Sequence, residues 1–208
     1  MRIGLVGVPG AGKSVLAQAI KTALESTGQQ EHLPVAIVDD YVAELQNDVD
    51  LALSWVGTYI GNAHIALKRE SAERIAYKDH PTVITCGTLF ETSSYTSQYM
   101  QGEYELIEKD DQAAKHDLVI RVEAITRMLA CLYVDTLKYD YIFYLPPIGE
   151  IEDFRVTELE KNLQAAFNGF DLYPVTKLFV EGDNILEITE NRLKIVLEEV
   201  LNADNTEG

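Results

Sequence analysis

The sequence predicts an α/β domain in which helices cover both faces of a five-stranded parallel sheet. Short apolar runs suited to buried strands alternate with longer stretches in which apolar residues recur at helical spacing. Strands and helices that alternate in this way form parallel β–α–β units, which need a helical layer on each face of the sheet. The chain has 208 residues, of which 47% are hydrophobic, and this suffices for one core. We therefore expect a single domain over residues 1–202 and a polar, frayed tail over 203–208.

Each element follows from a local pattern. The expected strands are short apolar runs, most of them bounded by proline, glycine or aspartate: residues 3–6, 34–38, 82–86, 141–145 and 175–180. The expected helices have helical periodicity or polar, helix-forming composition: residues 14–24, 41–77, 113–138, 154–167 and 185–201. The apolar stripe of the first helix consists of Val15, Leu16, Ala19, Ile20 and Ala23. The long region 41–77 is expected to break near residues 47–48 and at Gly57 or Gly61.

A glycine-rich segment lies between the first strand and the first helix. Residues 7–14, Gly-Val-Pro-Gly-Ala-Gly-Lys-Ser, fit the pattern G-x-x-x-x-G-K-[ST]. Glycines let successive backbone N–H groups turn inward around an anion, and the N-terminus of the helix adds its positive dipole end. Lys13 is expected to reach the β- and γ-phosphates, and the Ser14 hydroxyl to ligate Mg²⁺. The segment therefore predicts a site for ATP and Mg²⁺ formed by Gly7, Pro9, Gly10, Ala11, Gly12, Lys13, Ser14 and Val15.

The acidic composition restricts the partners of the chain. Aspartate and glutamate outnumber lysine and arginine by 34 to 17, a net charge of −17, which disfavours a broad nucleic-acid footprint. The one candidate for a local basic groove is the set Lys68, Arg69, Arg74 and Lys78, although such a run is more often a solvated helix face. No apolar run is long enough to span a membrane and the first residues do not form a leader, so we expect a cytoplasmic protein. The sequence does not decide between a monomer and a homodimer.

The order of these features resembles the P-loop kinases of nucleosides, nucleotides and related small molecules, in particular the group similar to nicotinamide riboside kinases. The phosphate loop over residues 7–14 is the specific part of the resemblance, and the layout matches over most of the chain. The resemblance implies a P-loop NTPase fold with a helical lid over about residues 148–170. It also implies an enzyme that transfers the γ-phosphate of ATP to a hydroxyl of a nucleoside, a nucleotide or a related small molecule.

On the acceptor side, the resemblance assigns roles to carboxylates that follow two strands. Asp39 and Asp40 end the second strand, where such kinases commonly hold the carboxylate that receives the proton of the acceptor hydroxyl. Asp39 is also a candidate for helping Ser14 to hold Mg²⁺, and both aspartates have the simpler alternative of capping the helix that follows. Glu91 and Tyr95 follow the third strand and are expected to contact the acceptor.

On the nucleotide side, two segments are implied. Arg155 opens the lid helix and is expected to neutralise the transferring phosphate, unless it pairs permanently with Glu152 or Glu158 at the surface. Gly182 and Asp183 follow the fifth strand, where such kinases hold the adenine with backbone groups. The lid sequence offers few large apolar residues, so we expect it to bury little surface and to open readily.

One position departs from the pattern of related kinases. They often carry an aspartate at the end of the third strand, where this chain has Cys86-Gly87-Thr88. Either Asp39, Asp40 or Glu91 supplies the missing carboxylate, or the chemistry is altered.

Two other functions therefore stay open. One is a kinase of hydroxymethylated pyrimidines in DNA, a chemistry known among phage-encoded P-loop kinases, and the other is a nucleotide-driven switch ATPase. Asp140 precedes the fourth strand, at the wrong end to activate water as in a mechanical ATPase.

Overall fold

The computed structural model of the chain describes residues 1–28, 32–39, 59–88, 91–92, 94, 107, 109–136, 139–150, 154–169, 175–182 and 184–203. The predicted residues Asp40, Tyr95 and Asp183 lie outside this part, as does the expected helix break near residues 47–48.

The strands form one parallel sheet, as predicted. They are β1 (Arg2–Val6), β2 (Val35–Val38), β3 (Thr82–Cys86), β4 (Tyr141–Tyr144) and β5 (Val175–Lys177), in the order β2-β3-β1-β4-β5. In register, Leu5 of β1 lies between Cys86 of β3 and Phe143 of β4. The loop after β1 therefore emerges near the middle of the carboxyl edge of the sheet, where ligands of parallel α/β sheets commonly bind. β5 is shorter than the expected 175–180, and residues 178–180 leave the sheet to border a cavity.

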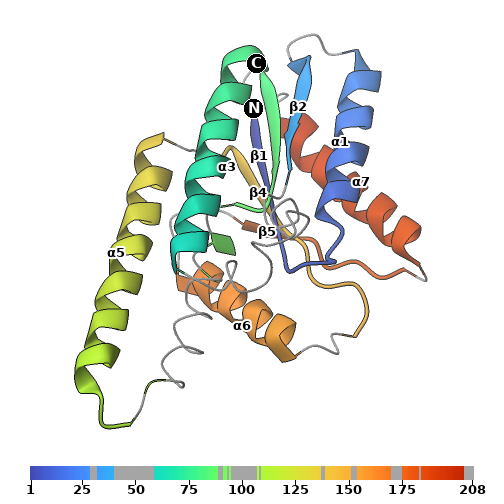
Figure 1. Ribbon diagram of the computed structural model, residues 1–208. Coiled ribbons are helices and arrows are strands. Elements are labelled where there is room, and N and C mark those ends of the chain that lie inside the picture. The colour runs from blue at the N-terminus through green and yellow to red at the C-terminus, as the bar shows by residue number, and fades with distance from the viewer. Residues whose placement is uncertain are drawn as a thin grey trace, which may run out of the picture.

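Helices cover both faces of the sheet. They are α1 (Lys13–Thr27), α3 (Tyr59–Asp79), α5 (Gln112–Thr136), α6 (Phe154–Gly169) and α7 (Ile185–Ala203). Figure 1 shows α1 and α7 together on one face and α3 on the other, with α5 packed outside α3. A break was expected at Gly57 or Gly61: α3 runs through Gly61, which excludes a break there, and Gly57 lies outside the described residues. No helix in the described ranges is both long enough and apolar enough to cross a membrane.

The main core lies between the sheet and the pair α1 and α7. It includes buried side chains of the central strands and of both helices: Ile3, Leu5, Leu16, Ile20, Leu24, Phe143, Val196 and Val200. The buried positions of α1 are Leu16, Ala17, Ile20 and Leu24, whereas Val15 is 48% exposed. The prediction that Val15 lies on the buried face of the helix is therefore wrong. Packing of the helix on the sheet, and not the apolar residues alone, decides which face is buried.

A second, polar cluster is buried between α3 and the sheet. The carboxylate oxygens of Glu73 accept hydrogen bonds from the hydroxyls of Tyr139 (2.6 Å) and Tyr77 (3.3 Å). Burial raises the pKa of Glu73, while the bond from Tyr139, the contact with Thr85 and the charge of Arg69 act in the opposite direction. Arg69 is itself fully buried, so it does not belong to a solvent-facing groove of cations. The prediction of a helix in this region gave no sign of this cluster.

We expect the buried carboxyl of Glu73 to make stability depend on pH. Because its pKa in the folded chain lies above the ordinary value of 4.5, the folded protein keeps a proton that the unfolded chain releases. The resulting stabilisation is present below the unfolded pKa and is lost as pH rises through the folded pKa. The free energy of unfolding of the wild type, relative to that of Glu73→Gln, should fall as pH rises above about 4.5. Urea denaturation at several pH values measures this free energy, and Glu70→Gln on the same helix serves as the control. If the difference between the wild type and Glu73→Gln does not depend on pH, Glu73 does not have a raised pKa in the folded protein.

Candidate active site

The phosphate loop joins β1 to α1 and is shaped by its glycines. Gly10 and Gly12 have φ angles of +83° and +88°, a region that residues with a side chain rarely adopt. A Cβ on Gly7 would lie 2.5 Å from the carbonyl oxygen of Leu145, so the chain can pass close to β4 only with glycine here. Local backbone geometry therefore explains why all three of these motif positions are glycine.

The N-terminus of α1 is open toward the loop. Gly12 is the N-cap and supplies no side-chain acceptor for the first N–H groups of the helix. Ser14 and Val15 are exposed at this end. Backbone donors without an internal acceptor at a helix N-terminus form a binding site for anions.

The Lys13 side chain is buried beneath the loop and not extended into solvent. It is 6% exposed, and its Nζ donates hydrogen bonds to the carbonyl of Gly7 (2.6 Å) and, more weakly, to that of Val8 (3.4 Å). Glu91 Oε1 lies 3.3 Å from Nζ and also accepts the N–H of Gly7 at 2.7 Å. Because both side chains are almost fully buried, the pair is screened little by water. Glu91 therefore holds both the lysine and the first residue of the loop.

Arg69 of α3 fixes the turn that carries Glu91. Its Nη1 donates to the carbonyl of Thr88 (2.7 Å) and to the hydroxyl of Thr92 (2.9 Å). The N–H groups of Glu91 and Thr92 both donate to the Thr88 carbonyl, at 3.1 and 3.4 Å. A buried guanidinium thus holds both ends of the turn, and the carboxylate between them faces Lys13.

Of the two candidates for the missing strand-three carboxylate that the structure describes, Asp39 and Glu91, it is Glu91 that lies at Lys13. β3 ends at the buried Cys86, and Gly87 turns the chain with a φ of +77°. Asp39 is exposed at the carboxyl end of β2, which is separated from β1 by β3. Two strand spacings, about 10 Å, therefore separate the strand of Asp39 from that of the phosphate loop. Asp140 lies at the opposite end of the sheet, where its carboxylate accepts the N–H of Arg2 at 2.7 Å.

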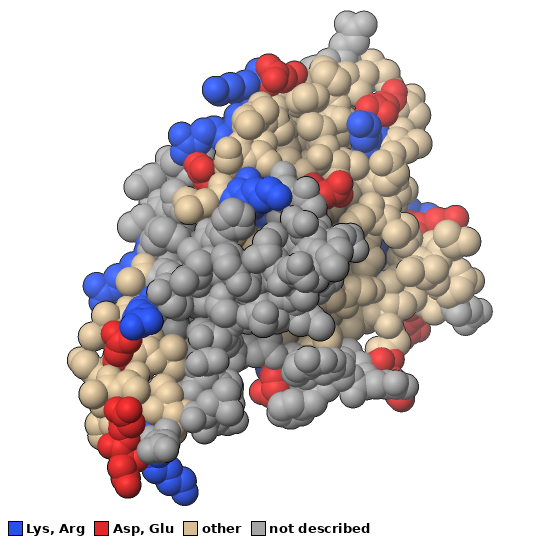
Figure 2. Space-filling view, viewed as in Figure 1, with Lys and Arg blue, Asp and Glu red and all other residues tan. Residues whose placement is uncertain are grey.

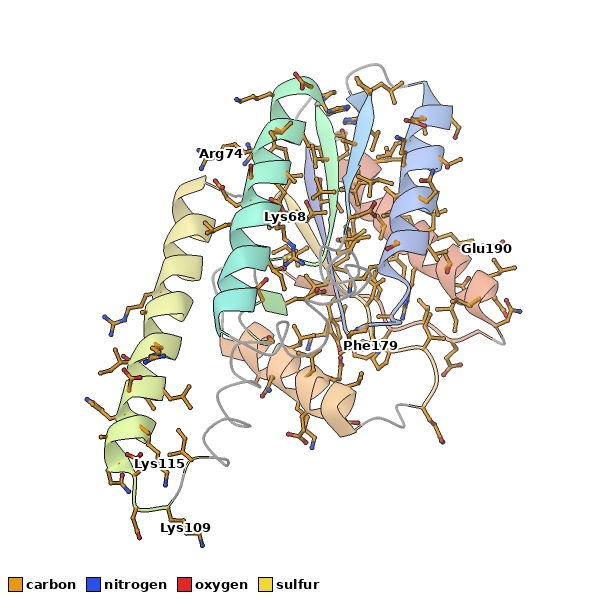
Figure 3. All side chains as sticks on the ribbon, in the orientation of Figure 1. Lys68, Arg74, Lys109, Lys115, Phe179 and Glu190 are labelled. Carbon is orange, nitrogen blue, oxygen red and sulfur yellow. The ribbon has the colours of Figure 1, made fainter. Side chains whose placement is uncertain are left out.

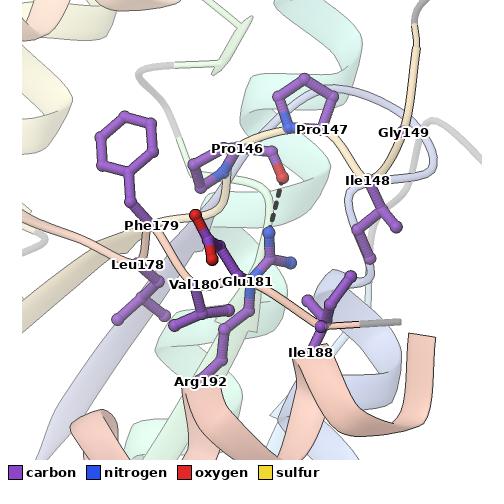
Figure 4. A pocket seen from close by; sticks show the side chains of 11 residues that line it. Pro146, Pro147, Ile148, Gly149, Leu178, Phe179, Val180, Glu181, Ile188 and Arg192 are labelled. Atoms are coloured by element: carbon purple, nitrogen blue, oxygen red, sulfur yellow. Dashed lines mark hydrogen bonds between the residues drawn. The ribbon is translucent and has the colours of Figure 1, made fainter. Parts of the chain in front are cut away.

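A cavity of about 500 Å³ borders the loop on the other side, at the ends of β4 and β5. Its walls are Pro146–Gly149, Leu178–Gly182, Ile188 and Arg192 (Figure 4). Most of these side chains are apolar, and Ile148 comes within 3.4 Å of the Cβ position of Gly12, so the cavity adjoins the phosphate loop. Gly182, which we expected near the adenine, lines it, and a Cβ there would lie 2.9 Å from Ile188.

Arg192 is the residue of this region that sequence reasoning missed. It is 3% exposed, and its Nη1 and Nη2 donate to the carbonyls of Ala11 and Pro146, each at 2.7 Å; Figure 4 draws the second bond. The sequence did contain a signal. Arg192 lies four and eight residues before Val196 and Val200, on the buried stripe of α7, where a cation needs buried partners.

The lid segment is only partly described. The backbone of Arg155 lies in the first turn of α6, but its side chain is outside the described part. The expectation that the segment buries little surface is wrong for α6, because Leu159 and Leu163 belong to the core and Val156 packs against it. Glu158 pairs with Lys161 at 2.6 Å. Figure 1 shows α6 at the carboxyl edge of the sheet, near the loop after β1.

Two cations of the expected basic groove already have protein partners or are buried. Arg69 is buried inside the protein, and Arg74 pairs with Glu70 on its own helix. Figure 3 shows Lys68 and Arg74 on α3, far from Lys109 and Lys115 at the start of α5. On the face shown in Figure 2, basic and acidic side chains alternate along the described surface. The described residues contain no group of three or more His, Cys, Asp or Glu side chains that could hold a metal ion.

Comparisons with known proteins identify the fold. No family model and no curated protein matches the chain. Among solved structures, it is similar to the NadR protein in complex with NR (TM-score 0.66, 16% identity), covering 95% of this chain and 48% of that one. This chain thus spans about half the length of the NadR chain. It is also similar to deoxyadenosine kinase from M. mycoides with bound dATP (TM-score 0.62, 16% identity). That match covers 96% of this chain and 99% of the kinase chain.

Thymidylate kinase from Ehrlichia chaffeensis (TM-score 0.54, 13% identity) matches over 97% of this chain and 98% of its own. The α/β P-loop NTPase fold predicted from the sequence is thereby confirmed, and the solved neighbours include nucleoside and nucleotide kinases.

Proposed function

We propose that the protein is a phosphotransferase that moves the γ-phosphate of ATP to a hydroxyl of a nucleoside, a nucleotide or a related small molecule. The observation that carries this proposal is the buried Lys13 under a glycine loop that contacts Ile148 and Arg192, two wall residues of a cavity of about 500 Å³. An anion site beside an apolar cavity fits a molecule with a phosphate chain at one end and a flat base at the other. The dATP bound to the deoxyadenosine kinase neighbour is a molecule of this kind.

The residues present fit ATP with Mg²⁺. The left-handed glycines Gly10 and Gly12 and the uncapped start of α1 provide N–H groups for the phosphates. The exposed Ser14 is available as a Mg²⁺ ligand, and Gly182 with its neighbours would hold the adenine. Mg²⁺ held at Ser14 would supply positive charge to the phosphates during transfer. Lys13 would leave the Gly7 carbonyl to reach the β- and γ-phosphates.

Glu91 and Asp39 would have different roles in transfer. Glu91 is buried and one of its oxygens already accepts two donors, so its charge is committed to holding Lys13 and the loop. Asp39 is exposed at the end of an outer strand, where an acceptor can reach it. We therefore assign proton abstraction from the acceptor hydroxyl to Asp39 or Asp40 and the anchoring of Lys13 to Glu91. The distance between the strands favours this role for Asp39 over that of a direct Mg²⁺ ligand beside Ser14.

DNA is a weaker candidate for the acceptor. The burial of Arg69 removes one of the four cations on which a local basic groove depended, and the net charge of −17 opposes a duplex.

The transfer assay tests the function directly. Incubating the protein with γ-labelled ATP, Mg²⁺ and a panel of nucleosides, nucleotides and modified DNA should label one class of small molecule. Lys13→Ala should abolish this labelling and leave circular dichroism unchanged, whereas Lys21→Ala on the outer face of α1 should retain it. Wild-type turnover in Lys13→Ala would mean that the loop is not the transfer site.

Variants of the two aspartates and of Glu91 should differ in their kinetics. Asp39→Asn or Asp40→Asn should lower kcat by about 10²-fold or more, the usual scale for a general base, with the KM for ATP little changed. Glu91→Gln should change both kcat and the KM for ATP, because it releases Lys13 and the Gly7 N–H together. Initial rates over a range of ATP concentrations separate these patterns, and an unchanged KM in Glu91→Gln contradicts the anchoring role.

Arg69 should act through Glu91. Arg69→Met should lower kcat/KM for ATP about tenfold in the wild type, because hydrogen bonds from a charged group are worth on the order of 1.5–3 kcal/mol. In a Glu91→Gln background, Arg69→Met should lower kcat/KM for ATP by less than about twofold, since the effects of residues that act as a unit are not additive. Thr92→Val, which removes only one of the two bonds, provides a milder variant if Arg69→Met does not fold. If Arg69→Met lowers kcat/KM equally in the wild type and in Glu91→Gln, Arg69 does not act through Glu91.

A further inference from the structure

We infer that Arg192 of α7 is a positioning residue of the phosphate loop, which orients the loop for phosphate and places a positive charge behind it. This inference rests on the proposed nucleotide site, and it assigns to the last helix a share of the affinity for the phosphate chain.

The first step is the hydrogen bond between Arg192 and the loop. An anion site made of backbone N–H groups requires the carbonyls of the same peptides to point outward. Outward carbonyls that are buried need a donor. Ala11 is buried, and its carbonyl accepts Nη1 of Arg192 at 2.7 Å. This bond holds the Ala11–Gly12 peptide immediately before Lys13.

The second step is the rigidity of the guanidinium. Its Nη2 donates to the carbonyl of Pro146 just beyond β4, again at 2.7 Å, so one planar group joins the phosphate loop to the end of a neighbouring strand. Arginine suits this task because its donors are held in a fixed fork, which lysine lacks. Figure 4 shows the side chain reaching from α7 toward Pro146 across the cavity.

The third step is the charge. Lys13 already has Glu91 as its counter-ion, but no described carboxylate forms an ion pair with Arg192. Glu181 lines the same cavity without pairing with it (Figure 4). The Nε of Arg192 has no hydrogen-bond partner within the described ranges, and burial alone lowers the pKa of the group.

A buried cation without a counter-ion is costly, and an anion bound in the adjacent loop would lower this cost. Nη1 lies 3.8 Å from the Cβ position of Gly12, close enough for its field to act on a phosphate in the loop.

The experiment separates the phosphate chain from the base. Isothermal titration with Mg²⁺-tripolyphosphate, with ATP and with adenosine would be done on the wild type, Arg192→Met, Arg192→Lys and Lys194→Met. Lys194 is exposed on the same helix, so its variant controls for the loss of one positive charge from α7. Urea unfolding without ligand measures stability separately.

Arg192→Met should weaken tripolyphosphate and ATP by similar factors of about 10 to 100, the range expected for hydrogen bonds from a charged group. Arg192 also lines the cavity assigned to the base, so adenosine binding should be weakened too, but by a smaller factor than tripolyphosphate binding. Arg192→Lys keeps the charge and loses the fork, so it should recover part of the loss. Lys194→Met should bind like the wild type.

Three results would overturn the inference. They are unchanged tripolyphosphate affinity in Arg192→Met, a loss confined to adenosine and ATP, and an Arg192→Lys protein that binds tripolyphosphate no better than Arg192→Met. If Arg192→Met does not fold, Arg192→Lys must bind tripolyphosphate more weakly than the wild type for the inference to stand. A wild type that binds neither tripolyphosphate nor ATP would instead reject the proposed function.

Discussion

The contact between Lys13, Glu91 and the Gly7 peptide is the interaction on which the rest of the site depends. A lysine that is almost fully buried must find acceptors and a counter-ion inside the protein, and here the loop carbonyl and one carboxylate provide them. The glycines of the loop and the turn after β3 serve this arrangement. Gly7 lets the loop approach β4, and the left-handed Gly87 redirects the chain so that Glu91 comes back under the loop.

Two arginines from opposite faces of the sheet support this arrangement. Arg69 belongs to α3 and acts on the turn that carries Glu91, whereas Arg192 belongs to α7 and acts on the loop itself. Each guanidinium is buried and donates to a backbone carbonyl. Such bonds are expensive to break, because a buried charged group would lose its acceptors. The loop is therefore held from both helical layers, and its glycines do not make it loose.

The sequence was sufficient to predict the fold and the position of the glycine loop between the first strand and the first helix. Alternating apolar runs predicted all five strands, and the motif located the loop, because both depend on local patterns that survive in any context. The roles of Glu91 and Arg192 depend on contacts between distant parts of the chain. Glu91 is 84 residues from Gly7, and Arg192 is 181 residues from Ala11. The prediction that Arg69 lies in a basic groove or on a solvated helix face was wrong for a related reason. A charged residue on a helix is expected to face solvent unless its buried partner is known.

If the protein has the proposed function, the strand order gives its two substrates separate halves of the sheet. The cavity assigned to the nucleotide lies at the ends of β4 and β5, and the aspartate assigned to the acceptor ends β2 at the other margin, with the phosphate loop between them. The parts of the chain that build these halves do not overlap, and β2 makes its ladder with β3 alone. Changes around β2 can therefore alter which acceptor is chosen while leaving the donor site intact, so in evolution the acceptor can diverge faster than the phosphate donor.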